Sequence, residues 1–230
     1  MTRTEKAVYA SFLPLALAAG MVVLYAPTDA LQGPVQRIFY LHVSSAIAAY
    51  FSFALVVAGS AVYLWRESTR ADRLARAAAP VGLLFTVVTI GMGIVWAKPI
   101  WGWDPTQTWD ARFTSTVVLG LIYAGYLLVR RLADPGRQAA RFAAVVGIAG
   151  FLDVPIVHFS VTWWRTLHPG RVLDAPGGPA LPPAMLVTFL VTLVAVLVFA
   201  GALVALRYQI EALLERRPRG APAAVPEPAR

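Results

Sequence analysis

Two histidines and a tryptophan-rich stretch between them are the residues of this sequence best suited to chemistry. His42 and His168 each lie beside aromatic residues, and four of the seven tryptophans fall within Trp96–Trp109. Neutral imidazole is a common axial ligand of haem iron. Two imidazoles beside an aromatic surface therefore indicate a seat for a flat, apolar, metal-centred ligand such as haem.

The composition predicts an all-α membrane protein. Hydrophobic residues make up 58% of the chain, charged residues make up 14%, and the mean hydropathy is +0.64, which is too apolar for an ordinary soluble domain. Six continuous apolar runs match the roughly 20 residues that a membrane helix needs, and they lack the alternation of a barrel. The six predicted spans are Val8–Ala26, Ile38–Trp65, Ala77–Trp96, Phe113–Val129, Phe142–Ser160 and Pro183–Leu206.

The basic residues predict that both termini are cytoplasmic. In that orientation 15 of the 20 lysines and arginines lie in inner segments, as the positive-inside rule requires. Topology and anionic lipid then account for the net charge of +8, so the charge gives no case for a nucleic-acid partner. We expect a multi-pass protein of the cytoplasmic membrane with both histidines on its outer face. The outer cations are Arg37, Lys98, Arg112, Arg165 and Arg171.

The chain is predicted to form one membrane domain followed by a short tail. Residues 1–215 would be the six-helix domain, including the tryptophan-rich segment 96–115, and residues 216–230 a disordered cytoplasmic tail rich in Pro, Ala and Arg. The first run lacks a small-x-small cleavage site before Pro27, so we expect it to stay as an uncleaved span. The chain has no cysteine, so any haem would be held non-covalently.

The tryptophan-rich segment is predicted to lead into a helix. Asp104 would cap it and Pro105 would be its first residue, which would place Trp109, Arg112 and Phe113 on one face. The alternative is an aromatic belt at the membrane surface, where tryptophan is common. The clustering of the tryptophans, with carboxylates between them, favours a site.

Each histidine also has a simpler interpretation. His42 could be satisfied by a neighbouring hydroxyl or carbonyl, and His168 could be a solvated loop residue. Their shared position on one face weakens both interpretations. His158 and Asp153 are expected to be structural, because Pro155 should kink their helix and the buried carboxylate should find a partner such as His158 or a hydroxyl.

Two arginines are candidates for the propionate groups of a haem. Arg112 and Arg165 are the outer cations nearest to the aromatic and histidine motifs. Arginine pairs strongly and directionally with carboxylates. Either residue could instead pair with Asp104 or Asp110.

Three stretches give the chain a resemblance to a known family. They are Tyr40–Ala46, which contains His42, then Trp101–Ser115, and finally Asp153–His168. Together they resemble the haem-handling membrane proteins of cytochrome c biogenesis, which carry a tryptophan-rich "WWD" segment between two outer histidines. The nearest resemblance is to the haem exporter protein C (CcmC) family, and it covers nearly all of the chain except the tail.

The tryptophan-rich segment departs from the family's pattern. That pattern runs roughly W-G-x-W-W-x-W-D, whereas this chain has more residues between the first tryptophan and the last aspartate and lacks the adjacent pair. The family's site therefore carries over directly to Trp101, Trp109, Asp110 and Arg112, and less directly to Trp103 and Asp104.

The resemblance implies a carrier rather than an enzyme. It would bind haem b at the outer face of the bacterial inner membrane and deliver it to a periplasmic haem chaperone for c-type cytochrome maturation. Its other partners would be ABC-type maturation subunits, a small membrane subunit and lipid. His42 and His168 would be the axial ligands of the iron, and the rest of the implied site is Trp101, Trp103, Trp109, Asp110, Arg112 and Arg165.

Two other functions stay open. A haem-containing electron-transfer subunit usually has ligands on both sides of the membrane, whereas both predicted ligands here are outer. A permease for haem or another solute would need a polar path at mid-membrane, for which Asp153 is thin support.

Overall fold

The computed structural model describes residues 1–102, 109–133, 136–164, 168, 172–173 and 177–216. Over these residues it is helical, without a strand, and six helical segments are long and apolar enough to cross a membrane. The all-α fold with six spans is therefore confirmed. The helices are α1 (Arg3–Gly20), α2 (Ile38–Arg66), α3 (Thr69–Trp101), α5 (Ala111–Leu132), α6 (Arg137–Phe151), α7 (Asp153–Trp163) and α8 (Pro183–Arg216), with short turns at Met21–Tyr25 and Pro34–Arg37.

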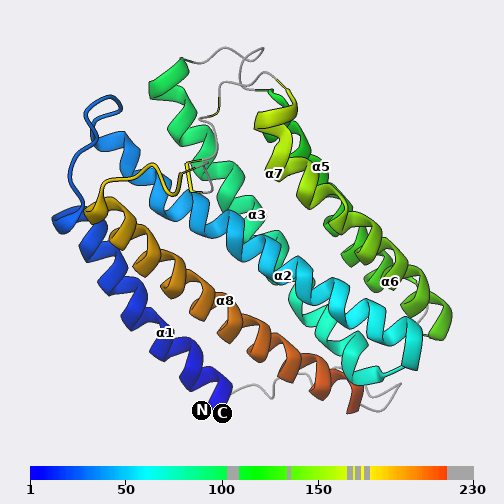
Figure 1. Ribbon diagram of the computed structural model, residues 1–230. Coiled ribbons are helices and arrows are strands. Elements are labelled where there is room, and N and C mark those ends of the chain that lie inside the picture. The colour runs from blue at the N-terminus through cyan, green and yellow to red at the C-terminus, as the bar shows by residue number, and fades with distance from the viewer. Residues whose placement is uncertain (103–108, 134–135, 165–167, 169–171, 174–176, 217–230) are drawn as a thin grey trace, which may run out of the picture.

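The hairpin of α2 and α3 forms the centre of the bundle (Figure 1). These two helices share the most extensive contact in the structure, α8 and α1 pack on one side, and α5 with α6 packs on the other. The start of α1 and the end of α8 lie at the same end of the bundle. This arrangement agrees with an even number of crossings.

Small residues let the central helices approach closely, as they do in many membrane bundles. A Cβ added at Gly59 of α2 would lie 2.6 Å from the backbone oxygen of Ala71 in α3. Nearer the middle, Phe53 of α2 stacks on Tyr123 of α5 at 3.6 Å between ring centroids. These contacts hold the three helices at fixed positions around the site described below.

The fifth span is broken near its middle. The helix stops at Phe151 and restarts at Asp153, with Leu152 between them. Pro155 explains the break, because it has no N–H to donate to the carbonyl of Phe151 and its ring clashes with that carbonyl. The helix is thus interrupted near Pro155, where a kink was predicted, and the break divides the predicted span into α6 and α7.

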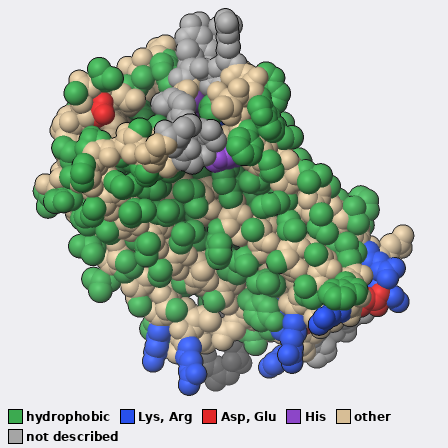
Figure 2. Space-filling view, viewed as in Figure 1, with side chains coloured by type: hydrophobic (Ala, Val, Ile, Leu, Met, Phe, Trp, Pro, Cys, Tyr) green, Lys and Arg blue, Asp and Glu red, His purple; other side chains and the backbone are tan. Residues whose placement is uncertain are grey.

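Charged side chains gather at the end of the bundle opposite the histidines (Figure 2). Arg76 of α3 pairs with Glu211 of α8 at 3.0 Å, and Arg130 of α5 pairs with Asp72 of α3 at 2.8 Å. These half-buried pairs tie three helices together. We call this end the arginine end and the other the histidine end.

Glu67 joins the α2–α3 turn to α6 at the arginine end. It pairs with Arg137 and with Arg141, the latter at 2.7 Å. Desolvation of the carboxyl opposes ionisation, but hydrogen bonds and charge from the two arginines outweigh it, so the pKa of Glu67 is lowered.

The start of α5 differs from the prediction. Asp104 and Pro105 lie outside the described residues, but Trp109 and Asp110 are not helical and α5 begins at Ala111. The helix starts there because Asp110 caps it, with Oδ1 accepting from the backbone N–H of Phe113 at 2.8 Å. Trp109 therefore precedes the helix, although its ring still contacts that of Phe113. The predicted tail falls outside the described residues, apart from the last residue of α8.

Candidate functional site

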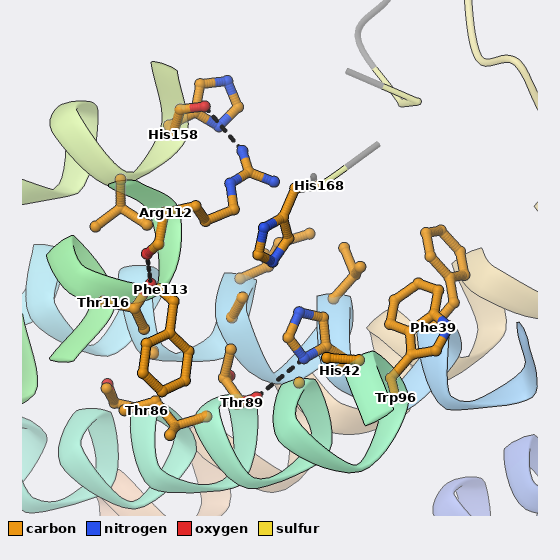
Figure 3. Close-up of a pocket in the computed structure, with 18 of the residues that line it drawn as sticks. Phe39, His42, Thr86, Thr89, Trp96, Arg112, Phe113, Thr116, His158 and His168 are labelled. Atoms are coloured by element: carbon orange, nitrogen blue, oxygen red, sulfur yellow. Dashed lines mark hydrogen bonds between the residues drawn. The ribbon is translucent and has the colours of Figure 1, made fainter. Parts of the chain in front are cut away.

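All three histidines of the chain line one pocket at the histidine end (Figure 3). The pocket has a volume of about 310 Å³, at the lower end of the ~300–1,000 Å³ typical of ligand sites. Its walls come from α2, α3, α5 and α7 and from residues 168, 172 and 173. Most of the lining is aliphatic or aromatic, and a few polar groups converge within it.

His42 projects from the first turns of α2 toward α3. Its Nδ1 lies 3.0 Å from the backbone oxygen of Thr89, and its ring meets the edge of Trp96 at 5.8 Å between centroids. Thr89 donates its own hydroxyl proton to the oxygen of Phe85. The imidazole is therefore held from two sides by α3.

His168 reaches the same pocket from the segment between α7 and α8. Its Nδ1 lies 2.6 Å from Oδ2 of Asp110, whose side chain is only 8% exposed. Its ring lies 5.4 Å from that of Trp101, at the end of α3. Asp110 thus serves two purposes, since Oδ1 caps α5 and Oδ2 orients His168.

The hydrogen bonds at Nδ1 assign the same tautomer to both rings. A carbonyl oxygen and a carboxylate can only accept, so the Nδ1 of each neutral imidazole must carry the proton. The lone pair of each ring then lies on Nε2. Histidines that bind metals are commonly oriented in this way, with a carbonyl or carboxylate behind the ring.

Arg112 lines the pocket between these histidines and α7. Its Nη2 donates to the backbone oxygen of His158 at 2.9 Å, and Figure 3 shows its guanidinium beside the His168 ring. A cation here suits an anionic ligand group. His158 packs its ring against Phe159 at 4.8 Å and also lines the pocket.

Comparison with known proteins decides the family. The model of the family described as Heme exporter protein C (CcmC) matches residues 2–222. The chain belongs to the Heme exporter protein C family. Among its relatives, "Heme exporter protein C" of Bradyrhizobium diazoefficiens is 36% identical over 200 residues, covering 82% of this chain and 74% of the relative. That of Escherichia coli is 37% identical over 169 residues, covering 69% and 68%, and that of Haemophilus influenzae is 33% identical over 209 residues, covering 89% and 84%. Together with the six apolar helices, this makes the chain a multi-pass inner-membrane protein.

The predicted site residues of this CcmC-family chain are only partly brought together. His42, His168, Trp101 and Arg112 line the pocket, and Asp110 contacts it through His168. Trp109 does not line it, since its side chain packs on Phe113 at 5.0 Å and is 60% exposed. The two other predicted residues, Trp103 and Arg165, lie outside the described residues.

Several pocket residues were not assigned to a site from the sequence. Trp96 forms one wall, and its indole donates to the side chain of Gln32 at 2.8 Å. Gly93 lies under His42, and a Cβ there would come within 3.1 Å of the imidazole Cε1. The positions of Trp96 and Gly93, three residues apart on the helix that carries Thr89, could have indicated one face.

Asp153 differs from the prediction that it has a hydrogen-bond partner. Its Oδ2 is buried, and among the described residues no donor for that atom is recorded. It stands at the start of α7, directly after the break at Leu152. His158, expected to be structural, supplies a carbonyl to Arg112 and also lines the pocket.

Proposed function

We propose that this protein binds haem b non-covalently between His42 and His168 at the outer face of the inner membrane. It then passes the haem to a periplasmic haem chaperone for c-type cytochrome maturation. The observation that carries the proposal is the convergence of two histidines, 126 positions apart in the sequence, on one largely apolar pocket. Each has its Nδ1 beside a hydrogen-bond acceptor. Family membership supports haem as the cargo.

The described residues fit a haem in polarity and ligand type. Aliphatic and aromatic side chains from four helices form most of the lining, and Gly93 leaves space under His42 that a Cβ would fill. Arg112 supplies a positive group for a propionate. Trp96 and Trp101 would pack the macrocycle, while exposed Trp109 is better placed to contact the chaperone.

A carrier has specific chemical needs that this arrangement meets. His42 and His168 would both hold the iron, and ligation by two imidazoles would suppress oxygen chemistry while the haem is bound. The carboxylate of Asp110 and the carbonyl of Thr89 fix the ring orientations and tune ligand strength. Release to the chaperone then requires only that one imidazole yield to a ligand from the partner. The relatives are named as exporters, and holding and releasing haem requires no catalytic step.

The proposed orientation places the histidine end outside. The arginine end carries Arg73, Arg76, Arg130, Arg137 and Arg141, and such residues face the cytoplasm in most membrane proteins. A cytoplasmic arginine end would also present α8 and the α2–α3 turn to ABC-type partner subunits. Any use of ATP belongs to those partners.

The ligand assignment is tested by the visible spectrum of the purified protein. His42→Ala and His168→Ala should each shift the Soret band and lower the haem content, because one axial ligand is lost. His158→Ala is the matched control, since it removes a third imidazole from the same pocket and should leave the spectrum unchanged. Unchanged spectra in both ligand variants would overturn the assignment.

Delivery is tested separately from binding. Haem-loaded protein is mixed with a purified periplasmic haem chaperone, and the haem content of each is followed after separation. Transfer from the wild type and retention in the absence of chaperone are expected. Binding without transfer would leave a haem protein whose role is not delivery.

A further inference from the structure

The pocket lies where α2 and α7 have little direct contact with each other. On the side of the break toward the arginine end, α6 packs against α2. On the side toward the histidine end, α7 packs against α5 and α6 and has at most slight contact with α2. The pocket occupies the space between them, with Ala46 and Tyr50 of α2 on one side and Val157 of α7 on the other.

This space lies partly at the depth of the lipid hydrocarbon. A core of ~30 Å corresponds to about 20 helical residues. Counted from Arg66, the last residue of α2, the core ends near Ala46, and counted from Arg76 of α3 it ends near Trp96. Tyr50 and Thr89 are thus about one or two helical turns inside the core. The histidines lie near its boundary.

The lateral surface beside the gap is suited to lipid. Figure 2 shows hydrophobic side chains over most of the face drawn, while lysines and arginines gather at the end opposite the histidines. The facing wall of the pocket is fixed, because Trp96 is bonded to Gln32 and packs against Phe39. Between α2 and α7 the described residues make at most slight helix–helix contact.

We propose that haem reaches the pocket sideways, from the hydrocarbon of the membrane leaflet at the histidine end, through the gap between α2 and α7. This inference rests on the proposed function, since haem is the cargo. The porphyrin is largely apolar and partitions into lipid, so it would pass from one apolar phase to another without crossing the aqueous surface. The break at Leu152 separates α6, which packs against α2, from α7, which has at most slight contact with it, and Arg112 lines the pocket where it would receive the propionates.

The absence of cysteine in the chain allows a clean test. Ala46→Cys and Val157→Cys place one thiol on each side of the gap, and a reducible bifunctional thiol reagent bridges them. The protein is reconstituted in vesicles, and loading is followed at the Soret band after mixing with vesicles that contain haem. The bridged protein should load haem at least about tenfold more slowly, because the bridge holds the gap between α2 and α7 closed. Reduction should restore the rate, and each single-cysteine variant treated alike should load at the same rate before and after reduction.

A second measurement guards against a bridge that merely distorts the site. Protein loaded first and bridged afterwards should release haem to acceptor vesicles more slowly by a similar factor. Equal loading and release rates in bridged and reduced protein would overturn lateral access while leaving haem binding intact. Failure of the reduced protein to bind haem even when it is added in detergent would overturn the proposed function instead.

Discussion

The carboxylate of Asp110 offers the sharpest test of how the site holds its ligand. Asp110→Asn keeps an oxygen in place of Oδ1, and the N–H of Phe113 selects that oxygen for the cap. The amide nitrogen must then face Nδ1 of His168 in place of Oδ2. An amide N–H donates, so it favours the tautomer with the proton on Nε2, which removes the lone pair from the nitrogen proposed to bind iron.

The expected loss of haem affinity follows from the role of Asp110 in orienting the ring of His168. Loss of a hydrogen-bond partner behind a metal-binding histidine typically weakens metal affinity by about 10- to 100-fold, which corresponds to about 1.4–2.8 kcal/mol. The helix cap should survive, because Asn and Asp cap helices about equally well. We therefore expect weaker haem binding and a shifted Soret band with little change in the thermal stability of the haem-free protein.

The assay pairs a haem titration, read at the Soret band, with thermal melting of the haem-free protein. Asp110→Ala is the matched control, because it removes both the cap and the partner of His168 and should cost about 1 kcal/mol of stability through the cap alone. If Asp110→Asn binds haem as tightly as the wild type, the carboxylate does not set the tautomer. If it lowers the melting temperature as far as Asp110→Ala does, the cap argument is wrong.

Three further predictions address the pocket floor, the arginine end and the topology. Gly93→Val should displace the His42 ring, since even a Cβ would lie 3.1 Å from Cε1, and should weaken haem binding in the same titration. Gly91→Val, where a Cβ meets nothing within 4 Å, should bind normally, and equal losses would refute the steric reasoning. Glu67→Gln should lower the melting temperature at neutral pH. The pKa of Glu67 in the folded protein is lowered, so its contribution to the free energy of unfolding is present above the usual glutamate pKa. This contribution fades as pH falls through the folded pKa, and the melting temperatures of wild type and variant should therefore converge in acid. A difference that persisted in acid would contradict this. Leu31→Cys, at a 97% exposed site of the α1–α2 connection, should react with an impermeant thiol reagent added to intact spheroplasts, whereas Glu67→Cys should react only after lysis; the reverse pattern would invert the topology.

The spans were predictable because a membrane helix depends on a local property, the length of an apolar run. The same counting placed His42 and His168 at one end of the bundle, as the structure does. The sequence also indicated a disruption of the fifth span near Pro155, because a missing N–H acts within its own helix. Features that depend on one segment alone were thus accessible from the sequence.

Rotation of each helix about its axis was not predictable in the same way. Span counting gives the height of a residue in the membrane but not the direction in which it points. For this reason His158 was interpreted as structural although it lines the pocket, and Trp96 was grouped with the tryptophan-rich segment without a contact to His42. The double role of Asp110 also needed the tertiary structure, since its partner is 58 residues away.

The height of the pocket explains why its polar groups are few and directional. Haem has an apolar ring and two anionic groups, so a carrier at the membrane boundary must offer both environments to one molecule. Here Tyr50 and Val157 extend the pocket into the hydrocarbon, while Arg112 and Asp110 lie in the first residues of α5 or just before them. The ring would be held at depth and its propionates near the surface, where a chaperone would reach the proposed loop ligand, His168, before the proposed helix ligand, His42. This difference in access makes His168 the ligand we expect to be exchanged first.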